Sequence, residues 1–432
     1  YNYFRGGSIL SAKQPCHGMV KVIAGPVDSD KNSRVRGFLD SLLDSKYAKD
    51  GFTNGGPVVA FRHPRDDRVN PEYMGRHKVH VTDSADEIAS RIGSDTGTVV
   101  ISGVSHYDSN LVPLIDALAR SDRQVIVAGL NLDHHGKPYG IMEEVMALAD
   151  DVELAKAICF RARGRDTCQE LEVSRSVKLD EREYVAACVQ HFKYPDSPPV
   201  SHNDLGRLTA YVGAVCSSKS TKWNTVRQKL VEGGIVPVVF KYFNGEDRYG
   251  QNAGELMGSG KITLHTGETI DAINISAGLH IEEYIGNYGG DSEFVFIDEA
   301  QFPDELYGSI SRLVARGHKV HTNMLVRTFS RGPFMNTPSL MCLADEIKFS
   351  YSVCQQDGCG RPGTESQRVV KRAGSETIEP AHVNDPIEVI AGNRFEGVEA
   401  KDRYAYWGSC LNHLVLPGED ALPYSFDRYN SN

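Results

Sequence analysis

A glycine-led turn with a lysine and several hydroxyls stands between an apolar run and a polar segment, in Gly213-Ala-Val-Cys-Ser-Ser-Lys-Ser-Thr221. Between a strand and a helix, such a turn directs backbone N–H groups and the positive end of the helix dipole at a phosphate. Lys219 is expected to reach the terminal phosphates of a nucleotide, and Ser220 to help hold Mg²⁺. A plain strand-to-helix turn with a chance Lys-Ser-Thr is the alternative. The cofactor-binding residues expected here are Gly213, Ser217, Lys219, Ser220 and Thr221.

Two acids follow a second apolar run, in Ile297-Asp-Glu-Ala-Gln-Phe302. Open α/β sheets bind their ligands at the carboxyl ends of such strands. Glu299 is placed to take the proton from a sugar hydroxyl that attacks a γ-phosphate, and Asp298 to act through the Mg²⁺ shell. In the alternative interpretation the pair is a helix N-cap with first-turn acids.

Two pairs of metal-ligand residues occur near the end of the chain, Cys354-Gln-Gln-Asp-Gly-Cys359 and Cys410-Leu-Asn-His413. Zn²⁺ takes four tetrahedral Cys or His ligands, usually as two close pairs that join two loops. The predicted ligands are Cys354, Cys359, Cys410 and His413. Four protein ligands leave no open position, so the expected role is structural. Unrelated free cysteines are the alternative.

The elements that must hold these groups recur in the same order in the two halves of the chain. Each half opens with a β-branched run, at 20–24 and 208–212, and a lysine follows the next glycine at the same interval. Polar helical segments, further apolar strands and a Pro-aromatic pair, at 138–139 and 333–334, come next in both halves. Strands that alternate with helices predict a parallel sheet. We therefore expect an α/β protein in which a duplication has produced two P-loop parallel-sheet domains in tandem.

The phosphate loop and the Asp-Glu-Ala-Gln-Phe segment together resemble thymidine kinases of the compact, zinc-containing family. That family's pattern reads Gly-Pro-Met-Phe-Ser-Gly-Lys-Thr/Ser, then Asp-x-Arg, then Asp-Glu-x-Gln-Phe, and ends with a lasso loop beside a zinc site. The resemblance covers nearly all of 206–415 and, weakly, 18–170. It implies ATP, Mg²⁺ and structural Zn²⁺ as cofactors, a pyrimidine nucleoside as substrate, and a small zinc-stabilised lasso subdomain in the second half.

The resemblance also assigns roles to single residues. Asp247 and Arg248 fall on the Asp-x-Arg loop beside the phosphates, where Arg248 would steady the developing charge. Glu299 falls on the general base and Gln301 on its polar neighbour. The residues implied for the nucleoside pocket are Leu325, Phe329 and Phe334, with Ile387, Val389 and Tyr406 from the lasso.

Three features depart from the family pattern. Ser218 stands where the P-loop has glycine, a position whose backbone conformation costs a residue with Cβ about 1 kcal/mol, so we expect phosphate affinity to be reduced or lost. Val326 and Arg327 replace an Asp-Gly in the pocket loop, which puts the pocket shape in question. The first zinc pair, 354–359, has a four-residue spacer where the family has two.

The first half looks like a degraded copy. Its turn, Gly25-Pro-Val-Asp-Ser-Asp-Lys-Asn32, keeps the glycine and lysine, but Asp28 and Asp30 are expected to face the phosphate position and repel an anion. Ser102-Gly103 replaces the Asp-Glu pair, so no general base is expected. Cys159 lacks a Cys-x-x-Cys partner, so no zinc is expected in this half.

Length and composition set wider limits. A chain of 432 residues suits two domains. A net charge of −10 argues against general nucleic-acid binding, and no apolar run is long enough to span a membrane. Six cysteines are expected to be isolated and inert, namely Cys16, Cys159, Cys168, Cys188, Cys216 and Cys342. We expect an extension at 1–17, a degenerate domain at 18–192, a linker at 193–205, a kinase-like domain at 206–350, and a zinc/lasso subdomain with the tail at 351–432.

Two functional hypotheses follow. In the first, the second half phosphorylates the 5′-hydroxyl of thymidine or a related pyrimidine nucleoside, and the first half replaces a neighbouring subunit. In the second, both halves are pseudokinases that serve as a structural subunit of a larger, possibly organellar, assembly with other protein subunits. The sparse cysteines favour a reducing compartment, either cytoplasm or an organelle matrix such as that of the mitochondrion.

Overall fold

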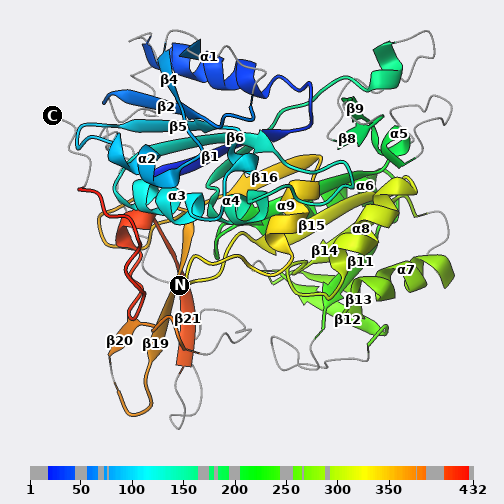
Figure 1. Ribbon diagram of the computed structural model, residues 1–432. Helices are drawn as coiled ribbons and strands as arrows, with labels where there is room; N and C mark the ends of the chain where they lie inside the picture. The colour runs from blue at the N-terminus through cyan, green and yellow to red at the C-terminus, as the bar shows by residue number, and fades with distance from the viewer. Residues whose placement is uncertain are drawn as a thin grey trace.

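Two seven-stranded sheets whose strands run in the same order form the body of the protein (Figure 1). The computed structural model describes residues 18–43, 56–66, 73–74, 77–163, 175–179, 183–193, 205–243, 256–264, 267–287, 292–375, 377–385 and 403–427. No helix in these ranges has the length and apolar character needed to span a lipid bilayer.

The first sheet has the order β3-β4-β2-β5-β6-β1-β7, parallel except where β3 joins β4. Its central strands are apolar and buried on both faces, as parallel strands covered by helices are. Helix α1 covers the outer face of this sheet, while α3 and α4 lie on the face toward the second half (Figure 1). The elements are β1 (Met19–Gly25), α1 (Lys31–Leu43), β2 (Val58–Arg62), β3 (Tyr73–Met74), β4 (His77–Val81), α2 (Ala85–Ser90), β5 (Thr98–Ser102), η1 (Val104–His106), α3 (Leu111–Arg120), β6 (Gln124–Leu130), α4 (Met142–Leu148) and β7 (Asp151–Leu154).

The second sheet has the order β12-β13-β11-β14-β15-β10-β16, which repeats the first strand for strand. This confirms the predicted α/β fold with two parallel sheets. Its elements are β10 (Arg207–Gly213), α6 (Lys219–Glu232), β11 (Val238–Tyr242), β12 (Ser259–Thr263), β13 (Thr269–Ile275), α7 (Gly278–Asn287), β14 (Phe294–Asp298), α8 (Leu306–Ala315), β15 (Lys319–Leu325), α9 (Thr337–Leu343) and β16 (Glu346–Ser350).

Smaller elements follow each sheet. After the first come η2 (Phe160–Arg163), β8 (Arg175–Lys178), β9 (Tyr184–Ala187) and α5 (Val189–Lys193). After the second come β17 (Ser352–Val353), β18 (Pro362–Gly363), β19 (Glu365–Lys371), β20 (Ile378–Pro380), β21 (Arg403–Ser409) and η4 (Leu411–His413). Strands β19, β20 and β21 form an antiparallel sheet, here called the ribbon, that projects from the body (Figure 1). The predicted linker lies outside the described residues apart from Lys193 and Leu205.

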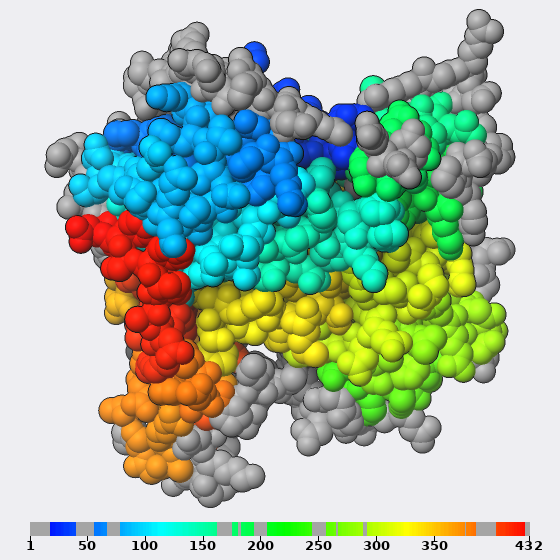
Figure 2. All heavy atoms as spheres, viewed as in Figure 1, coloured from blue at the N-terminus to red at the C-terminus, as the bar shows by residue number. Residues whose placement is uncertain are grey.

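The two halves share one buried core. Helix α4 packs against α9, and β7 lies near β16, so that buried side chains from both sheets belong to one continuous cluster. The C-terminal segment 414–427 runs from the zinc-type cysteines back over the first half (Figure 2). There Arg120 pairs with Glu419, and the Tyr424 hydroxyl donates to Asp86 at 2.9 Å. The halves are thus joined by packing at the centre and, at the edge, by the segment 414–427, here called the strap.

Candidate functional site

The predicted phosphate loop joins β10 to α6. A Cβ at Gly213 would lie 2.2 Å from the Ser350 carbonyl oxygen, so a glycine is needed where the loop leaves the sheet. Cys216 and Ser218 both adopt left-handed backbone, with φ of 58° and 61°. Helix α6 then begins at Lys219, which points the amino end of a 14-residue helix at the carboxyl edge of the sheet. Ser218 therefore does occupy the conformation that glycine adopts without strain.

Three oxygen and amide groups meet beside this loop. The Asn323 amide donates to the Ser220 hydroxyl at 2.9 Å and to the Asp298 carboxylate at 2.6 Å. Asn323 comes from β15 and Asp298 from β14, where the two residues are register partners. The structure therefore brings Ser220, predicted to help hold Mg²⁺, next to Asp298, predicted to act through the Mg²⁺ shell, by way of a residue that the sequence pattern did not indicate.

The other loop residues take different positions. The Lys219 ammonium donates to the Ala214 carbonyl at 3.4 Å, within the loop itself. Ser217 is buried, and its hydroxyl has no hydrogen-bond partner among the described residues. Thr221 lies exposed in the first turn of α6. The Val215 N–H donates to the Ser366 hydroxyl at 3.1 Å, which ties the loop to the ribbon.

The predicted base lies at the same edge of the sheet. Glu299 directly follows β14 and has a left-handed backbone, with φ of 54°. Gln301 is fully buried, and its amide donates to the Glu299 carboxylate at 2.5 Å. A non-glycine residue in this conformation stores strain, which is common where a side chain must be aimed at a ligand.

The predicted nucleoside-pocket residues gather beyond β15, with one unexpected neighbour. Phe329 and Phe334 are buried, and the Phe334 ring meets Phe302 edge-on at 5.4 Å between centroids. The Arg368 guanidinium, also fully buried, lies 5.0 Å from the Phe329 ring centroid and 5.9 Å from that of Tyr406. The nearest ring is Tyr404, 3.9 Å away, so this cation lies near two rings that the family resemblance assigns to the nucleoside pocket.

Some predicted residues lie outside the described ranges, namely Asp247, Arg248, Ile387 and Val389. Their roles stay predictions. Leu325 is the last residue of β15, at the entrance to the loop that carries Phe329 and Phe334.

The predicted zinc ligands come together. Ligand atoms of Cys354, Cys359, Cys410 and His413 all lie within 4.8 Å of one another. His413 Nδ1 is 3.5 Å from Cys354 Sγ and 3.4 Å from Cys410 Sγ, spacings that suit ligands on one tetrahedral ion. Burial opposes ionisation of Cys354, but hydrogen bonds from Cys410, Gln356 and His413 outweigh it and lower its pKa to about 6. A thiolate is the form that binds metal.

The first half holds a second cluster of this kind, so the expectation that Cys159 and Cys188 are isolated was wrong, whereas Cys16 and Cys168 lie outside the described residues. Cys159, Cys188 and His191 are all buried, with His191 Nδ1 3.4 Å from Cys159 Sγ and 3.1 Å from Cys188 Sγ. A hydrogen bond from Cys188, the largest influence, lowers the pKa of Cys159 to about 5. The spacing of Cys188-Val-Gln-His191 repeats that of Cys410-Leu-Asn-His413, a signal present in the sequence.

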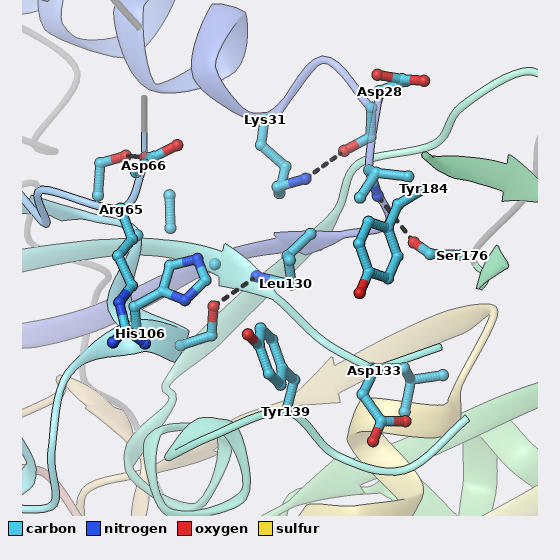
Figure 3. Close-up of a pocket in the computed structure, with 18 of the residues that line it drawn as sticks. Asp28, Lys31, Arg65, Asp66, His106, Leu130, Asp133, Tyr139, Ser176 and Tyr184 are labelled. Carbon is cyan, nitrogen blue, oxygen red and sulfur yellow. Dashed lines mark hydrogen bonds between the residues drawn. The ribbon is translucent and has the colours of Figure 1, made fainter. Parts of the chain in front are cut away.

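A cavity of about 740 Å³ opens at the carboxyl edge of the first sheet (Figure 3). Lys31, His106, Tyr139 and Tyr184 point into it from four segments. Burial lowers the pKa of His106, which favours its neutral form. The cavity is lined by Val27, Asp28, Ser29, Lys31, Asn32, Arg65, Asp66, Ser102, Gly103, Ser105, His106, Ala128, Gly129, Leu130, Leu132, Asp133, His134, Tyr139, Ser176 and Tyr184.

Two details of this cavity refine the sequence interpretation. Asp28 lines it as expected, but Asp30 turns away and its carboxylate pairs with Arg34 at 2.7 Å. Where the second sheet has Glu299, the first has Gly103 after Ser102, whose hydroxyl donates to Asp66. The cavity thus has a lysine and polar walls without an acid at the position of the predicted base.

Comparison with known families accounts for the shared architecture. The thymidine kinase family model matches residues 55–192 and again 206–394, together well over half of the chain. The chain belongs to the thymidine kinase family. Two successive matches, on two sheets of the same strand order, are consistent with a tandem-duplicated thymidine kinase. Membership supports a kinase-type phosphotransferase role and implies a nucleoside substrate with ATP and Mg²⁺.

Proposed function

We propose that the second half transfers the γ-phosphoryl group of ATP to the 5′-hydroxyl of thymidine or a related pyrimidine nucleoside. The contact that carries this proposal is the shared Asn323 amide, which holds the Ser220 hydroxyl and the Asp298 carboxylate beside the start of α6. Oxygen groups of this kind suit Mg²⁺, and the helix start suits phosphate.

Each remaining group then has a task. Lys219 binds the terminal phosphates, and Glu299, held by Gln301, accepts the proton of the attacking hydroxyl. Mg²⁺, when bound, neutralises charge on the phosphates. Asp247 and Arg248 are proposed to stand beside the phosphates, with Arg248 steadying the developing charge. The nucleoside is proposed to bind against Leu325, Phe329 and Phe334, with Ile387, Val389 and Tyr406 covering it.

We also propose a structural Zn²⁺ at Cys354, Cys359, Cys410 and His413. Because these four ligands come from the turn between β17 and β18 and from the end of β21, an ion there would fasten that turn to the end of the ribbon. The Cys159, Cys188 and His191 cluster is proposed to supply three of the four ligands of a second Zn²⁺.

The test is turnover by the purified full chain with Mg-ATP and thymidine, measured as thymidine monophosphate. Substitution of Glu299 by Gln should lower kcat at least about a hundredfold, the usual effect of removing a general base, while ATP still stabilises the protein against heat. Glu293→Gln is the matched control, because Glu293 lies at the opposite end of the same strand and pairs with Lys319. Equal turnover by E299Q and wild type would exclude Glu299 as the base.

A second candidate, a catalytically inactive structural subunit, is favoured by the position of Arg368. Its guanidinium lies over the Tyr404 ring at 3.9 Å and 5.0 Å from the Phe329 ring centroid, close to where the base of a nucleoside would stack, and Ser218 strains the phosphate loop. A folded, zinc-loaded sample that neither ATP nor thymidine stabilises, and that forms no product, would establish this alternative over the first.

A further inference from the structure

Five charged side chains form a buried network where the two halves and the ribbon meet. Asp116 and Asp150 come from the first half, Arg327 and Arg331 from the loop after β15, and Glu365 from β19. The most exposed of the five side chains, Asp116, shows 9% of its surface. Charges removed from water in this way are stable only when each has a well-placed partner.

The contacts are specific. Arg327 donates to the Asp150 carboxylate at 2.6 Å and to the carbonyls of Leu148 and Ala149 at 3.1 Å each. Arg331 donates twice to Asp116, at 2.7 and 3.0 Å, and also to Glu365. Asp116 also accepts from Arg120, one turn along the same helix, at 2.8 Å.

The two arginines flank Phe329, one two residues before it and the other two residues after it. The backbone on either side of this predicted base-stacking ring is therefore held by carboxylates of the first half. Planar guanidinium groups with several donors restrict a loop in this way better than single contacts do.

The corresponding loop of the first half is built differently. The strand registers make Leu130 at the end of β6 equivalent to Leu325 at the end of β15, so Leu132 is the counterpart of Arg327. Leu132 is buried and apolar. By contrast, Asp150 and Asp345 play the same part in both halves, since each accepts the N–H of the opening strand, from Val20 and Leu208, at 2.9 Å. The arginine contacts are thus present in one of two loops that follow corresponding strands of a repeated framework.

We propose that Asp116 and Asp150 are positioning residues for the nucleoside-binding loop of the second half. They act through Arg331 and Arg327, and Glu365 joins the loop to the ribbon. The first half then serves as the fixed support against which the pocket of the second half is shaped. This inference rests on the proposed nucleoside kinase function.

A control pair is available in the same interface. Arg175 of β8 lies 3.4 Å from Asp345, which follows α9, and both side chains are largely buried. This pair joins the same two halves without using a residue of the loop 325–334. A variant that breaks it should weaken the contact between halves and leave the pocket in place.

The experiment compares Asp116→Asn with Arg175→Gln in the full chain. D116N should raise the KM for thymidine at least about tenfold, with kcat and the KM for ATP changed less than about twofold, because a displaced loop affects one substrate. R175Q should lower the melting temperature and leave both KM values unchanged. The conservative variant D116E should recover part of the thymidine affinity. Equal effects of D116N and R175Q on KM would overturn the proposal.

Hydrogen–deuterium exchange of the peptide that covers 325–334 provides a readout that needs no turnover. Faster exchange in D116N, but not in R175Q, is expected even if the wild-type protein forms no product. This measurement therefore distinguishes failure of the positioning proposal from failure of the kinase proposal. If D116N does not fold, the double variant D116N/R331M, which removes both charges of the pair, replaces it. Unchanged exchange in a folded variant would overturn the positioning role.

Discussion

The two sheets repeat one strand order, yet the loops at their carboxyl edges differ in chemistry. Both turns keep a glycine that no larger residue could replace, since a Cβ at Gly25 or Gly213 would lie within 2.4 Å of a carbonyl oxygen. Both turns also fold the lysine back onto the carbonyl after that glycine, from Lys31 to Pro26 and from Lys219 to Ala214. The acids that follow β14 have no counterpart after β5. The first half therefore keeps the backbone framework of the second half but lacks those acidic groups.

The two halves differ both in chemical groups at the carboxyl edges of the sheets and in a buried contact, since Arg327 of the second half corresponds to Leu132 of the first. Gly103 stands where the second half has Glu299, whereas the metal-type cysteines recur in both halves because they hold small elements together. This pattern favours a division of roles in which the second half carries the chemistry and the first half supports it. The following predictions test that division.

Zinc content should give the largest effect. The intact chain is expected to carry two Zn²⁺ ions, and Cys410→Ser should release one and unfold the ribbon, because structural zinc contributes on the order of 10 kcal/mol to folding. Cys188→Ser should release the other. Metal analysis by mass spectrometry, alongside the melting temperature, measures both.

Cys342→Ala is the control for these variants, since Cys342 is buried but belongs to neither cluster. If the wild-type protein carries a single Zn²⁺ ion and C188S carries it too, the first half does not bind zinc.

Acid should destabilise the folded chain in part through His321, a buried group of β15 that has no histidine at the matching position of β6. Burial lowers the pKa of His321 to about 4, and its ring stacks on Phe296, while β6 has Ile126 at the matching register. The folded state holds His321 neutral, so stability is lost as pH falls from about 6.5 to about 4, by about 1.4 kcal/mol per pH unit at most.

Denaturant unfolding of His321→Ile between pH 7 and pH 4 checks this prediction. The variant should lose less stability across that range than the wild type. Parallel pH profiles for the two proteins would mean that His321 is not the group responsible.

Replacement of Ser218 by Gly should have the smallest effect, a gain in stability with ATP affinity unchanged. The left-handed strain of Ser218 is part of the folded loop with or without nucleotide, so its relief is expected to stabilise the fold by about 1 kcal/mol at most, measurable as a small rise in melting temperature. Asp30→Gly in the first half should bring no gain, because Asp30 is not among the residues with positive φ. A loss of affinity in S218G would mean that the Ser218 side chain itself contacts the nucleotide.

Local patterns in the sequence predicted the parts of the site that lie along one stretch of chain. The turn before Lys219, the acids after β14 and the pairs of zinc ligands were found in this way, because a strand end or a ligand spacing is visible in a few residues. The repeated element order likewise predicted two sheets of the same kind.

The groups that were missed depend on which strands become neighbours. Asn323 meets Asp298 only because β14 and β15 pair in that register, and Arg368 faces Tyr406 only because β19 pairs with β21. Arg327 was noticed as a departure from the family pattern, but its partner Asp150 lies 177 residues away. Such contacts follow from packing at long range, which spacing along the chain does not reveal.

The strap at 414–427 has a consequence for the order in which the molecule is completed during translation. Every strand of the first sheet lies between Met19 and Leu154, so that sheet can close while later segments are still inside the ribosome. The surfaces of α2 and α3 that Tyr424 and Glu419 cover stay bare until those residues emerge. The first sheet can therefore form with this surface uncovered, and the segment 414–427, made later, then covers it.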